Sequence, residues 1–247
     1  MAADATAASV DYGIDAPLVA RAWFGRAAWS LGGGLLFWFM NRQEYPGPSA
    51  RVFGALALVA VVCAAIAWLK IHSSREGKLA LREQLLDQLA LKGDEKVLDV
   101  GCGRGLLAIG AAKRLKTGKV TGIDVWNPQD LSDNSPEAAR ENAKAEGVSD
   151  RVRFDTGDAR KLVYPDGFFD AAISSNALHT LADDHEREQA LQEILRVLKP
   201  GGRLVIFDTA ETGYYAEVLR ECGAQDVTLS AWTFLWCRPS RSVAARK

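Results

Sequence analysis

Residues 97 to 105 read Val-Leu-Asp-Val-Gly-Cys-Gly-Arg-Gly, and no other stretch constrains the fold of this 247-residue chain as strongly. An apolar strand here runs into three glycines at alternate positions. Glycine has no Cβ atom and adopts positive φ readily, so the turn after the strand lets the backbone approach a ligand closely. A second apolar run, Lys119–Asp124, ends in a carboxylate. Its distance in sequence from the last of these glycines is typical of an acid that binds ribose hydroxyls.

Strand and helix patterns alternate along the chain after residue 76. Ser135 before Pro136, and Asp183 three residues before Glu186, are typical helix starts. Such alternation predicts an α/β fold with a mostly parallel sheet wound on both faces. We expect strands at residues 96–100, 119–124, 152–156, 169–174, 203–207, 227–229 and 233–237, and helices at residues 76–91, 106–115, 136–146, 183–198 and 214–221.

Four signatures in this order resemble the class I S-adenosylmethionine-dependent methyltransferases, over about residues 76–238. They are the glycine loop, the acid after the second strand, an Asp-Ala pair after the third strand, and the Leu-Lys-Pro-Gly-Gly turn at residues 198–202. The resemblance implies a Rossmann-like, doubly wound, seven-stranded sheet whose last strands are antiparallel. It also implies S-adenosyl-L-methionine as cofactor, with the loop at its methionine part, Asp124 on its ribose and Asp158 near its adenine amine. The expected cofactor-binding residues are Asp99, Gly101, Cys102, Gly103, Gly105, Asp124, Val125, Asp158, Ala159 and Ser174.

A nicotinamide-dependent dehydrogenase is the first alternative, because its fold also begins with a strand, a glycine turn and a helix. Its fingerprint, G-x-G-x-x-G, places the third glycine at position 106, where this chain has Leu106. Asp99 also interrupts a strand that in dinucleotide-binding proteins tends to stay apolar. A second alternative is a membrane protein that binds the cofactor without catalysis, and the intact acids argue against it.

The acceptor site is expected after the fourth strand, where residues 174–179 read Ser-Ser-Asn-Ala-Leu-His. His179 is a candidate general base because its side chain titrates near neutral pH; the alternative is a polar residue that only shapes the pocket. Asn176 is the second catalytic candidate. Relatives that methylate amines carry an Asn/Asp-Pro-Pro-aromatic motif here. This segment instead resembles the branch that acts on small molecules such as quinones, sterols and arsenite.

The acceptor class is narrowed by the cysteines and by the N-terminal region. Arsenite enzymes need several pocket cysteines, and the cysteines here lack a suitable grouping. A small acceptor that is lipid-like or quinone-like fits better beside a membrane segment. A soluble small molecule stays open as the alternative.

Residues 52–69 are an uninterrupted apolar stretch without charge. As a helix they would be roughly 27 Å long, close to the ~30 Å thickness of the bilayer hydrocarbon. Upstream, residues 27–40 are also apolar, and extension back to Leu18 reaches spanning length but includes Arg21 and Arg26. A Pro/Gly-rich turn separates the two runs. We therefore expect a membrane hairpin in residues 1–72, with transmembrane helices at about 18–40 and 52–71, and a methyltransferase domain in residues 73–247.

The charges that flank this hairpin predict its orientation. The two outer ends carry more basic residues than the turn, so the positive-inside rule places the catalytic domain in the cytoplasm. Acidic residues close to the N-terminus, without a basic segment before them, argue against a secretory signal. A buried hairpin within a soluble protein stays open, because the first apolar core is short and contains three consecutive glycines. The outer ends carry Arg21, Arg26, Lys70, Arg75 and Lys78, and the turn carries Arg42 and Arg51.

Composition disfavours nucleic-acid and metal sites. The net charge is −1, with 30 basic and 31 acidic residues interleaved, whereas proteins that bind nucleic acid usually carry a basic stripe. His185 beside Asp183 and Asp184 fits a solvated helix start better than a metal site. Ala60 and Ala64, four positions apart, are typical of helix pairing in a bilayer and make a homodimer an expectation. Free thiols are expected at Cys63, Cys102, Cys222 and Cys237, which show no metal-ligand spacing.

Overall fold

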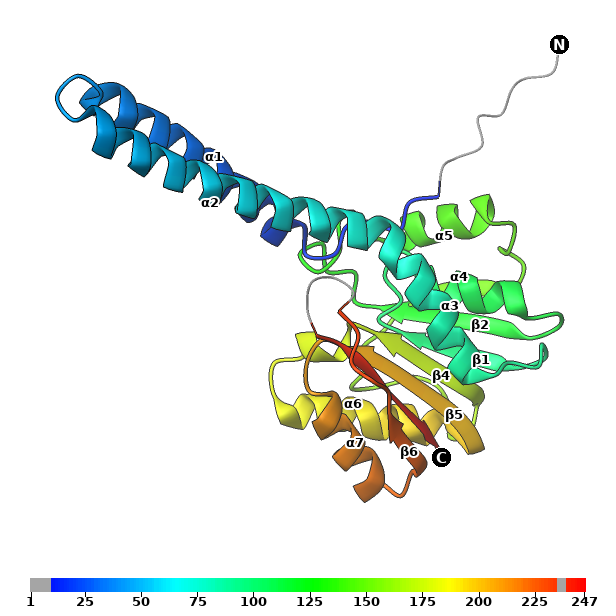
Figure 1. The fold of residues 1–247 in the computed structure, drawn as a ribbon. Helices are drawn as coiled ribbons and strands as arrows, with labels where there is room; N and C mark the ends of the chain where they lie inside the picture. The colour runs from blue at the N-terminus through cyan, green and yellow to red at the C-terminus, as the bar shows by residue number, and fades with distance from the viewer. Residues whose placement is uncertain (1–9, 235–238) are drawn as a thin grey trace, which may run out of the picture.

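The computed structural model describes residues 10–234 and 239–247. They form a seven-stranded sheet covered by helices on both faces, and a long helical hairpin that projects from this domain (Figure 1). The strand order is β3-β2-β1-β4-β5-β7-β6, with β1 to β5 parallel and β7 antiparallel to both of its neighbours. The predicted α/β fold with an antiparallel edge is confirmed. The strands are β1 (Lys96–Val100), β2 (Lys119–Asp124), β3 (Val152–Thr156), β4 (Phe169–Ser175), β5 (Leu198–Asp208), β6 (Gln225–Leu229) and β7 (Arg241–Arg246).

Two hydrophobic cores fill the space between the sheet and its helices. Side chains along β5 alternate between them: Leu204 and Ile206 enter one core, and Val205 and Phe207 enter the other. Both faces of the sheet are therefore buried, which explains why its strands read as apolar runs. One core includes residues of α3 (Lys78–Leu89), α4 (Leu106–Arg114) and α5 (Pro136–Ala145), and the other includes residues of α6 (Asp184–Val197) and α7 (Thr212–Glu221).

Capping residues start two helices where the sequence predicts them. Ser135 Oγ accepts a hydrogen bond from the backbone N–H of Ala138 at 3.1 Å. Asp183 Oδ1 accepts one from the backbone N–H of Glu186 at 2.9 Å. Each bond satisfies an N–H that has no partner inside its helix, so α5 and α6 begin at the predicted positions.

The last strand is not where the sequence analysis expects it. Thr233 makes only an isolated bridge to Ser240, and residues 235–238, which include Cys237, lie outside the described part of the chain. β7 instead uses a segment whose small side chains, Val243 and Ala245, are buried under helices. Pairing with β5 and β6, together with burial of these side chains, selects this segment for the sheet.

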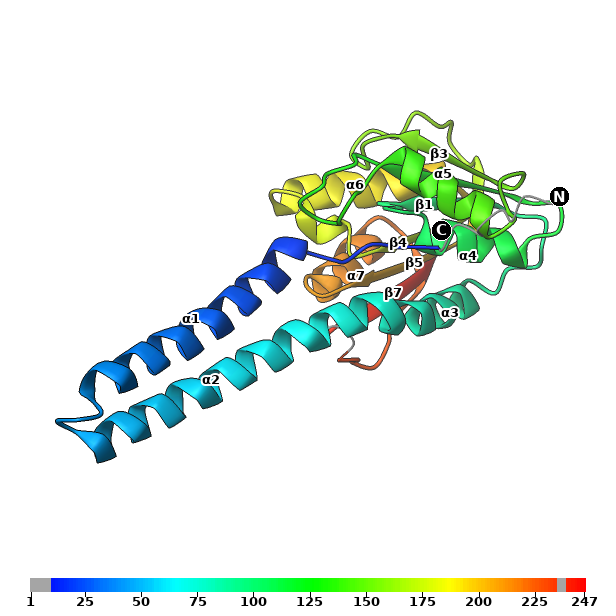
Figure 2. The ribbon, with the colours of Figure 1, turned by 90° about the horizontal axis from the view of Figure 1, so that it is seen from above.

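The N-terminal helices α1 (Pro17–Asn41) and α2 (Pro46–His72) pack side by side as an antiparallel hairpin (Figure 2). A Cβ atom added to Gly34 would lie 3.0 Å from Cβ of Leu56, so this glycine allows the helices to approach closely. α2 begins six residues earlier than expected. Pro46 and Pro48 lie in its first turn, where the backbone N–H that proline lacks has no helical partner.

Small residues of α2 face the interior of the hairpin. Ala60 and Cys63 are buried and share a helical face with Leu56, which contacts α1. Ala60 therefore packs within one chain, whereas Ala64 is only partly buried, and the homodimer stays a prediction.

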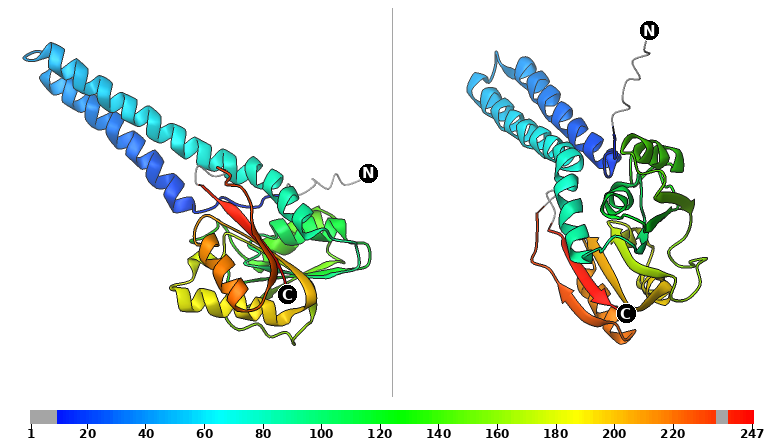
Figure 3. Two further views of the ribbon diagram at one scale, coloured as in Figure 1. Left: turned by 60° about the horizontal axis from the view of Figure 1, so that its bottom comes forward. Right: turned by 90° about the vertical axis from the view of Figure 1, so that its right-hand side faces the viewer.

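α2 does not stop where the hairpin meets the domain. It continues through a π-helical segment, Ser73–Gly77, into α3, and the helix bends there (Figure 3). The domain boundary expected at residue 72 thus falls inside one helical run. By length and composition, Pro46–Leu89 is the one helix of the described chain that qualifies as a membrane span, and α1 is not among the candidates. The expectation of two spanning helices is supported for α2 alone.

An N-terminal strap, residues 10–16, crosses the domain before α1 begins. Tyr12 is buried, and its hydroxyl donates to Glu146 Oε1 at 3.0 Å. The Asn142 amide donates to the carbonyl oxygen of Asp11 at 2.8 Å and accepts from its N–H at 3.1 Å. The strap therefore belongs to the domain and fixes the position from which α1 leaves it.

Candidate functional site

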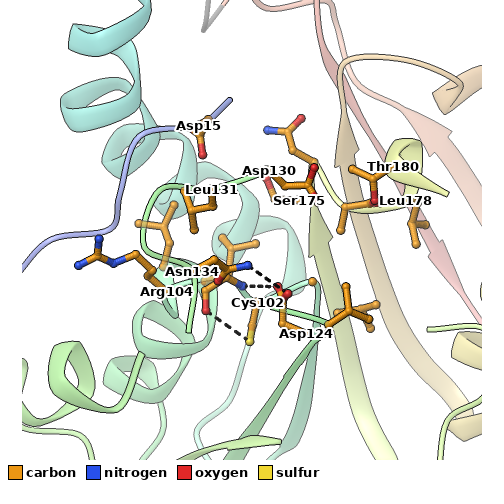
Figure 4. A pocket seen from close by; sticks show the side chains of 18 of the residues that line it. Asp15, Cys102, Arg104, Asp124, Asp130, Leu131, Asn134, Ser175, Leu178 and Thr180 are labelled. Atoms are coloured by element: carbon orange, nitrogen blue, oxygen red, sulfur yellow. Dashed lines mark hydrogen bonds between the residues drawn. The ribbon is translucent and has the colours of Figure 1, made fainter. Parts of the chain in front are cut away.

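A cavity of about 320 Å³ opens at the carboxyl ends of the parallel strands (Figure 4). The glycine loop after β1 and the segments after β2, β3 and β4 form most of its wall. The strap and the base of α2 complete that wall. Parallel α/β sheets bind ligands at the carboxyl ends of their strands, at the point where the strand order reverses. In this sheet the order reverses on either side of β1.

The glycine loop forms the floor of the cavity. Gly101 has φ 71° and Gly103 has φ 50°, conformations that favour glycine. A Cβ atom on Gly101 would lie 2.1 Å from Cβ of Ala177, and one on Gly103 would lie 2.8 Å from Leu131. Backbone N–H groups of Gly101 and Cys102 both donate to the carbonyl oxygen of Ile123, which ties the loop to β2.

Asp99 is buried at the end of β1 and lines the cavity. Its Oδ2 accepts a hydrogen bond from the backbone N–H of Ala108 at 2.8 Å, whereas Oδ1 has no hydrogen-bond partner among the described residues. Burial, with a smaller contribution from the nearby carboxylate of Asp124, raises the pKa of Asp99 to about 8. A cationic ligand group would favour the ionised form of this carboxyl group.

Protein N–H groups hold the carboxylate of Asp124 in place at the end of β2. Oδ2 accepts from the Gly103 backbone at 2.8 Å, and Oδ1 accepts from the Trp126 backbone at 2.7 Å and from the Asn134 amide at 3.2 Å. Two carboxylate oxygens offer about four acceptor sites, so one further hydrogen bond remains available. The side chain lines the cavity beside Asn134, as Figure 4 shows.

Asp158 lines the cavity after β3 and is held by a cation that the sequence analysis does not predict. Arg160 donates from Nε to both carboxylate oxygens at 3.0 Å, and from Nη2 to Oδ2 at 2.6 Å. These bonds lower the pKa of Asp158 below its usual range. Arg160 also pairs with Glu186 of α6.

Ten residues were expected to bind the cofactor, and the structure brings eight of them to the cavity. Gly105 and Ser174 lie behind its wall. Gly105, at φ 86°, starts α4 close to Phe154, and Ser174 Oγ donates to the Val100 carbonyl at 2.8 Å, which ties β4 to β1. The eight residues that line the cavity are Asp99, Gly101, Cys102, Gly103, Asp124, Val125, Asp158 and Ala159.

His179 and Asn176 line the opposite wall, in the segment after β4. His179 Nδ1 lies 2.8 Å from Oδ1 of Asp208, a fully buried carboxylate at the end of β5. The other oxygen of Asp208 accepts from the His179 backbone N–H at 3.2 Å and from the Tyr215 hydroxyl at 3.4 Å. Because Nδ1 is directed at Asp208, Nε2 is the imidazole nitrogen that can exchange a proton with a ligand. Asn176 adopts φ 52°, and its buried Oδ1 lacks a hydrogen-bond partner within residues 10–234 and 239–247.

A family model described as a methyltransferase domain matches residues 97–202, which span the glycine loop, Asp124, Asp158 and the Leu-Lys-Pro-Gly-Gly turn. This domain belongs to the class I S-adenosylmethionine-dependent methyltransferases. The methyltransferase domain thus contains all the cavity residues that the sequence predicts.

Individual relatives agree with this assignment. The methyltransferase GfsG of Streptomyces halstedii is 40% identical over 139 residues, which are 56% of this chain and 46% of that protein. A demethylmenaquinone methyltransferase of Lactiplantibacillus plantarum is 37% identical over 131 residues, 53% of this chain and 52% of that protein. The chain thus spans about half the length of the curated relatives it matches.

One protein of solved structure shares the fold but is named for a different activity. The [4+2]-cyclase SpnF superposes with a TM-score of 0.57 and 25% identity, over 70% of this chain and 83% of that chain. The fold of a methyltransferase domain does not by itself establish methyl transfer.

The residues of the methyltransferase domain fit S-adenosylmethionine. The unpartnered, buried oxygen of Asp99 is an acceptor on the side of the cavity that the methionine part of this cofactor would occupy. Gly101 and Gly103 leave no room for a side chain, so only backbone lies beneath the cofactor there. Asp124 is fixed in position and can accept one further hydrogen bond from a ribose hydroxyl.

Several cavity residues were missed from sequence. Asp208 is the last residue of β5, and the rule that ligands bind at the carboxyl ends of strands is a signal that could have found it. Nothing local in the sequence indicates that the strap and the base of α2 reach the cavity. The missed lining residues are Asp15, Ala16, Lys70, Ser74 and Lys78, and two missed residues outside the lining, Arg160 and Asp208, hold the lining residues Asp158 and His179.

Proposed function

We propose that this protein transfers a methyl group from S-adenosylmethionine to a small, lipophilic acceptor that carries an acidic hydroxyl, at the cytoplasmic surface of a membrane. The proximity of His179 to the buried Asp208, across the cavity from the cofactor residues, carries the chemical part of this proposal. The apolar surface of the hairpin carries the part that concerns location.

The bound cofactor supplies an activated methyl group on a sulfonium. His179 Nε2 takes the proton from the acceptor hydroxyl, and the buried carboxylate of Asp208 stabilises the imidazolium that forms. An oxygen deprotonated in this way would attack, in line, the methyl carbon of a cofactor held by Asp99, Gly103 and Asp124, and the sulfur would leave as a neutral thioether. The walls of the cavity hold the acceptor at about 3 to 3.5 Å from that carbon, which accounts for much of the acceleration.

The names of relatives support a small acceptor. A demethylmenaquinone methyltransferase acts on a quinone-type molecule by its name, and it matches the domain at 37% identity. A 27-O-demethylrifamycin SV methyltransferase matches at 36% identity. Both names describe small molecules, which agrees with a cavity of about 320 Å³.

The surface of the hairpin favours a membrane over water. Most of the large hydrophobic side chains that are exposed in the described chain belong to α1 and α2, and they surround both helices. Trp29 is 83% exposed, Leu36 is 60% exposed and Val61 is 65% exposed. A contiguous apolar surface of this kind marks a site that lipid or another apolar partner covers. We infer that the hairpin inserts into the bilayer.

Charges at the base of the hairpin favour a cytoplasmic domain. Arg21, Arg26, Lys70 and Arg75 lie at this end, whereas Lys78 is buried in the domain and does not contribute. The guanidinium of Arg26 lies 4.7 Å from the ring centre of Trp23, nearer the base. It therefore points toward the lipid headgroups, as an arginine near the end of an inserted helix does.

The experiment is untargeted transfer of an isotope-labelled methyl group. Full-length protein in detergent receives labelled S-adenosylmethionine and a bacterial membrane lipid extract, and mass analysis identifies what gains a methyl. The proposal expects a labelled small molecule that disappears with His179→Gln, while the variant still binds cofactor. Cofactor binding without any labelled product would instead favour an activity other than methyl transfer. SpnF, named a [4+2]-cyclase, shares the fold and is an example of a different activity.

A further inference from the structure

The base of the hairpin forms one wall of the cavity. Asp15 and Ala16, just before α1, and Lys70, in the last turn of α2, all line it. The segment that carries the catalytic candidate His179 lines the same cavity. Both ends of the hairpin therefore meet at the site, rather than at a linker beside it.

Hydrogen bonds fix the base of the hairpin to the domain. The Ala16 N–H donates to the Asp130 carbonyl at 2.9 Å, and Ser74 Oγ donates to the Asp15 carboxylate at 3.1 Å. The buried ammonium of Lys78 donates to the carbonyl oxygens of Tyr12 and Gly13 at 2.7 and 2.6 Å. Because both ends are held, the hairpin has one orientation relative to the cavity.

Apolar surface begins next to the residues that line the cavity. Leu18 and Val19 follow Ala16 by two and three positions, and Leu69 precedes Lys70; all three are exposed. The described chain just after β6 also lies near the base of the hairpin (Figures 1 and 3), and it exposes Trp232 and Phe234. Exposed aromatic and aliphatic groups at one level of the molecule are typical of a membrane interface.

We propose that the acceptor is a bilayer-resident amphiphile that enters the cavity beside the base of the hairpin. Its reactive head group reaches His179, and its apolar tail stays along α1 and α2 in the lipid. The hairpin then acts as part of the substrate entrance, in addition to holding the enzyme at the membrane. This inference rests on the proposed methyl transfer and deepens it by naming the substrate class and its route.

The first experiment asks which acceptors are methylated and whether the entrance matters. Full-length protein in phosphatidylcholine vesicles receives labelled cofactor with either the chloroform-soluble or the water-soluble fraction of a membrane extract. We expect label in the chloroform-soluble fraction. Lys70→Trp should obstruct the entrance and lower this transfer at least fivefold without changing cofactor affinity. Arg75→Trp loses the same charge on the same helical run but lies outside the cavity lining, and it should retain transfer.

Label confined to the water-soluble fraction, or equal rates for Lys70→Trp and Arg75→Trp, would overturn the inference while methyl transfer itself stands. Absence of label in both fractions would mean that the proposed function fails.

A second measurement does not depend on turnover. The photoreactive residue benzoylphenylalanine replaces Gln129, an exposed residue that lines the cavity next to the contact between Asp130 and Ala16. Illumination in the same vesicles should produce a lipid adduct. Benzoylphenylalanine in place of Lys116 should give no lipid adduct. Lys116 is exposed in the turn before β2, at the amino ends of the strands. No adduct at Gln129, or equal adducts at both positions, would overturn the membrane-facing entrance even if methyl transfer is observed.

Discussion

The cofactor half and the acceptor half of the cavity are built in different ways. The cofactor half consists of backbone turns and of acids at the ends of β1 and β2 and just after β3, and protein N–H groups already hold all three acids. The acceptor half combines the segment after β4, the end of β5, the strap and the base of the hairpin. The acceptor half is therefore formed by segments that are far apart in sequence, whereas each residue of the cofactor half lies at or near the end of its own strand.

This difference separates the general part of the reaction from its specific part. Strand ends of a buried sheet are rigid and keep the cofactor residues in register. The acceptor half depends on how additional segments dock, and the hairpin that supplies one of its walls also meets the membrane in our proposal. Substitutions in the two halves should therefore change different measured quantities, cofactor affinity in one and turnover in the other.

Gly101→Ala should have the largest effect on the cofactor half. The added Cβ would overlap Ala177, at 2.1 Å, so we expect cofactor affinity to fall roughly 100-fold. Gly147→Ala is the matched control, because Gly147 has a similar φ of 69° but no heavy atom within 4 Å of an added Cβ. Isothermal titration compares the two. Equal affinities would show that the loop does not approach the ligand.

His179→Gln should affect only the acceptor half. Loss of a general base lowers kcat by about 10² to 10⁴, and the dissociation constant of the cofactor should stay the same. His185→Gln, an exposed histidine in the first turn of α6, serves as control. Asp208→Asn should lower kcat less and change the pH profile, because the imidazolium loses its buried counter-charge. Unchanged turnover in His179→Gln would mean that His179 shapes the pocket and is not a general base.

Asp99→Asn should weaken cofactor binding about tenfold, by removal of one charge-assisted hydrogen bond. Because burial raises the pKa of Asp99 to about 8, the group is mostly protonated at neutral pH in the free protein. Affinity of the wild type for a cationic cofactor should therefore rise as the pH increases through about 8, and the asparagine variant should lose this dependence. Titrations at several pH values measure both.

The same substitution should stabilise the free protein. A carboxyl group whose pKa is higher in the folded state binds more protons there than in the unfolded state, so its contribution to stability falls between about pH 4 and pH 8. At pH 8, Asp99→Asn should melt a few degrees higher than the wild type without cofactor, at about 2 to 4 °C per kcal/mol. A lower melting temperature would show that ionisation of the buried carboxyl group of Asp99 does not destabilise the free protein.

Lys78→Met should have the smallest effect on turnover, a few-fold, and a clear effect on stability. The substitution leaves the carbonyl oxygens of Tyr12 and Gly13 without their buried donor, at a cost of about 1 to 3 kcal/mol. Lys116→Met, on the surface, should be close to neutral. Thermal melting and protease sensitivity of the strap measure the difference. If both variants behave alike, the strap is not held by Lys78.

Sequence predicts the cofactor half because each of its elements is local. Asp99 lies in β1, Gly101 directly follows that strand, and Ser135 and Asp183 cap their own helices. The fold follows from alternation of such units. Gly105 and Ser174 show the limit: a glycine or serine at a strand end serves equally well to start a helix or to join two strands.

The acceptor half could not be predicted in the same way. His179 was a candidate, but its contact with Asp208 depends on β4 and β5 being neighbours in the sheet. The strap reaches the cavity through Asn142 and Ser132, which are distant from it in sequence. The position of β7 and the packing of α1 on α2 likewise depend on burial between distant segments, which no single stretch of sequence encodes.

The central claim is that the cavity at the carboxyl end of the sheet binds S-adenosylmethionine, and calorimetric titration of the full-length protein tests it most directly. We predict one cofactor molecule per chain, with affinity reduced at least tenfold in Asp124→Ala, because the ribose loses a hydrogen bond of about 1.5 to 3 kcal/mol. Unchanged affinity in that variant, or no binding by the wild type, would contradict the account.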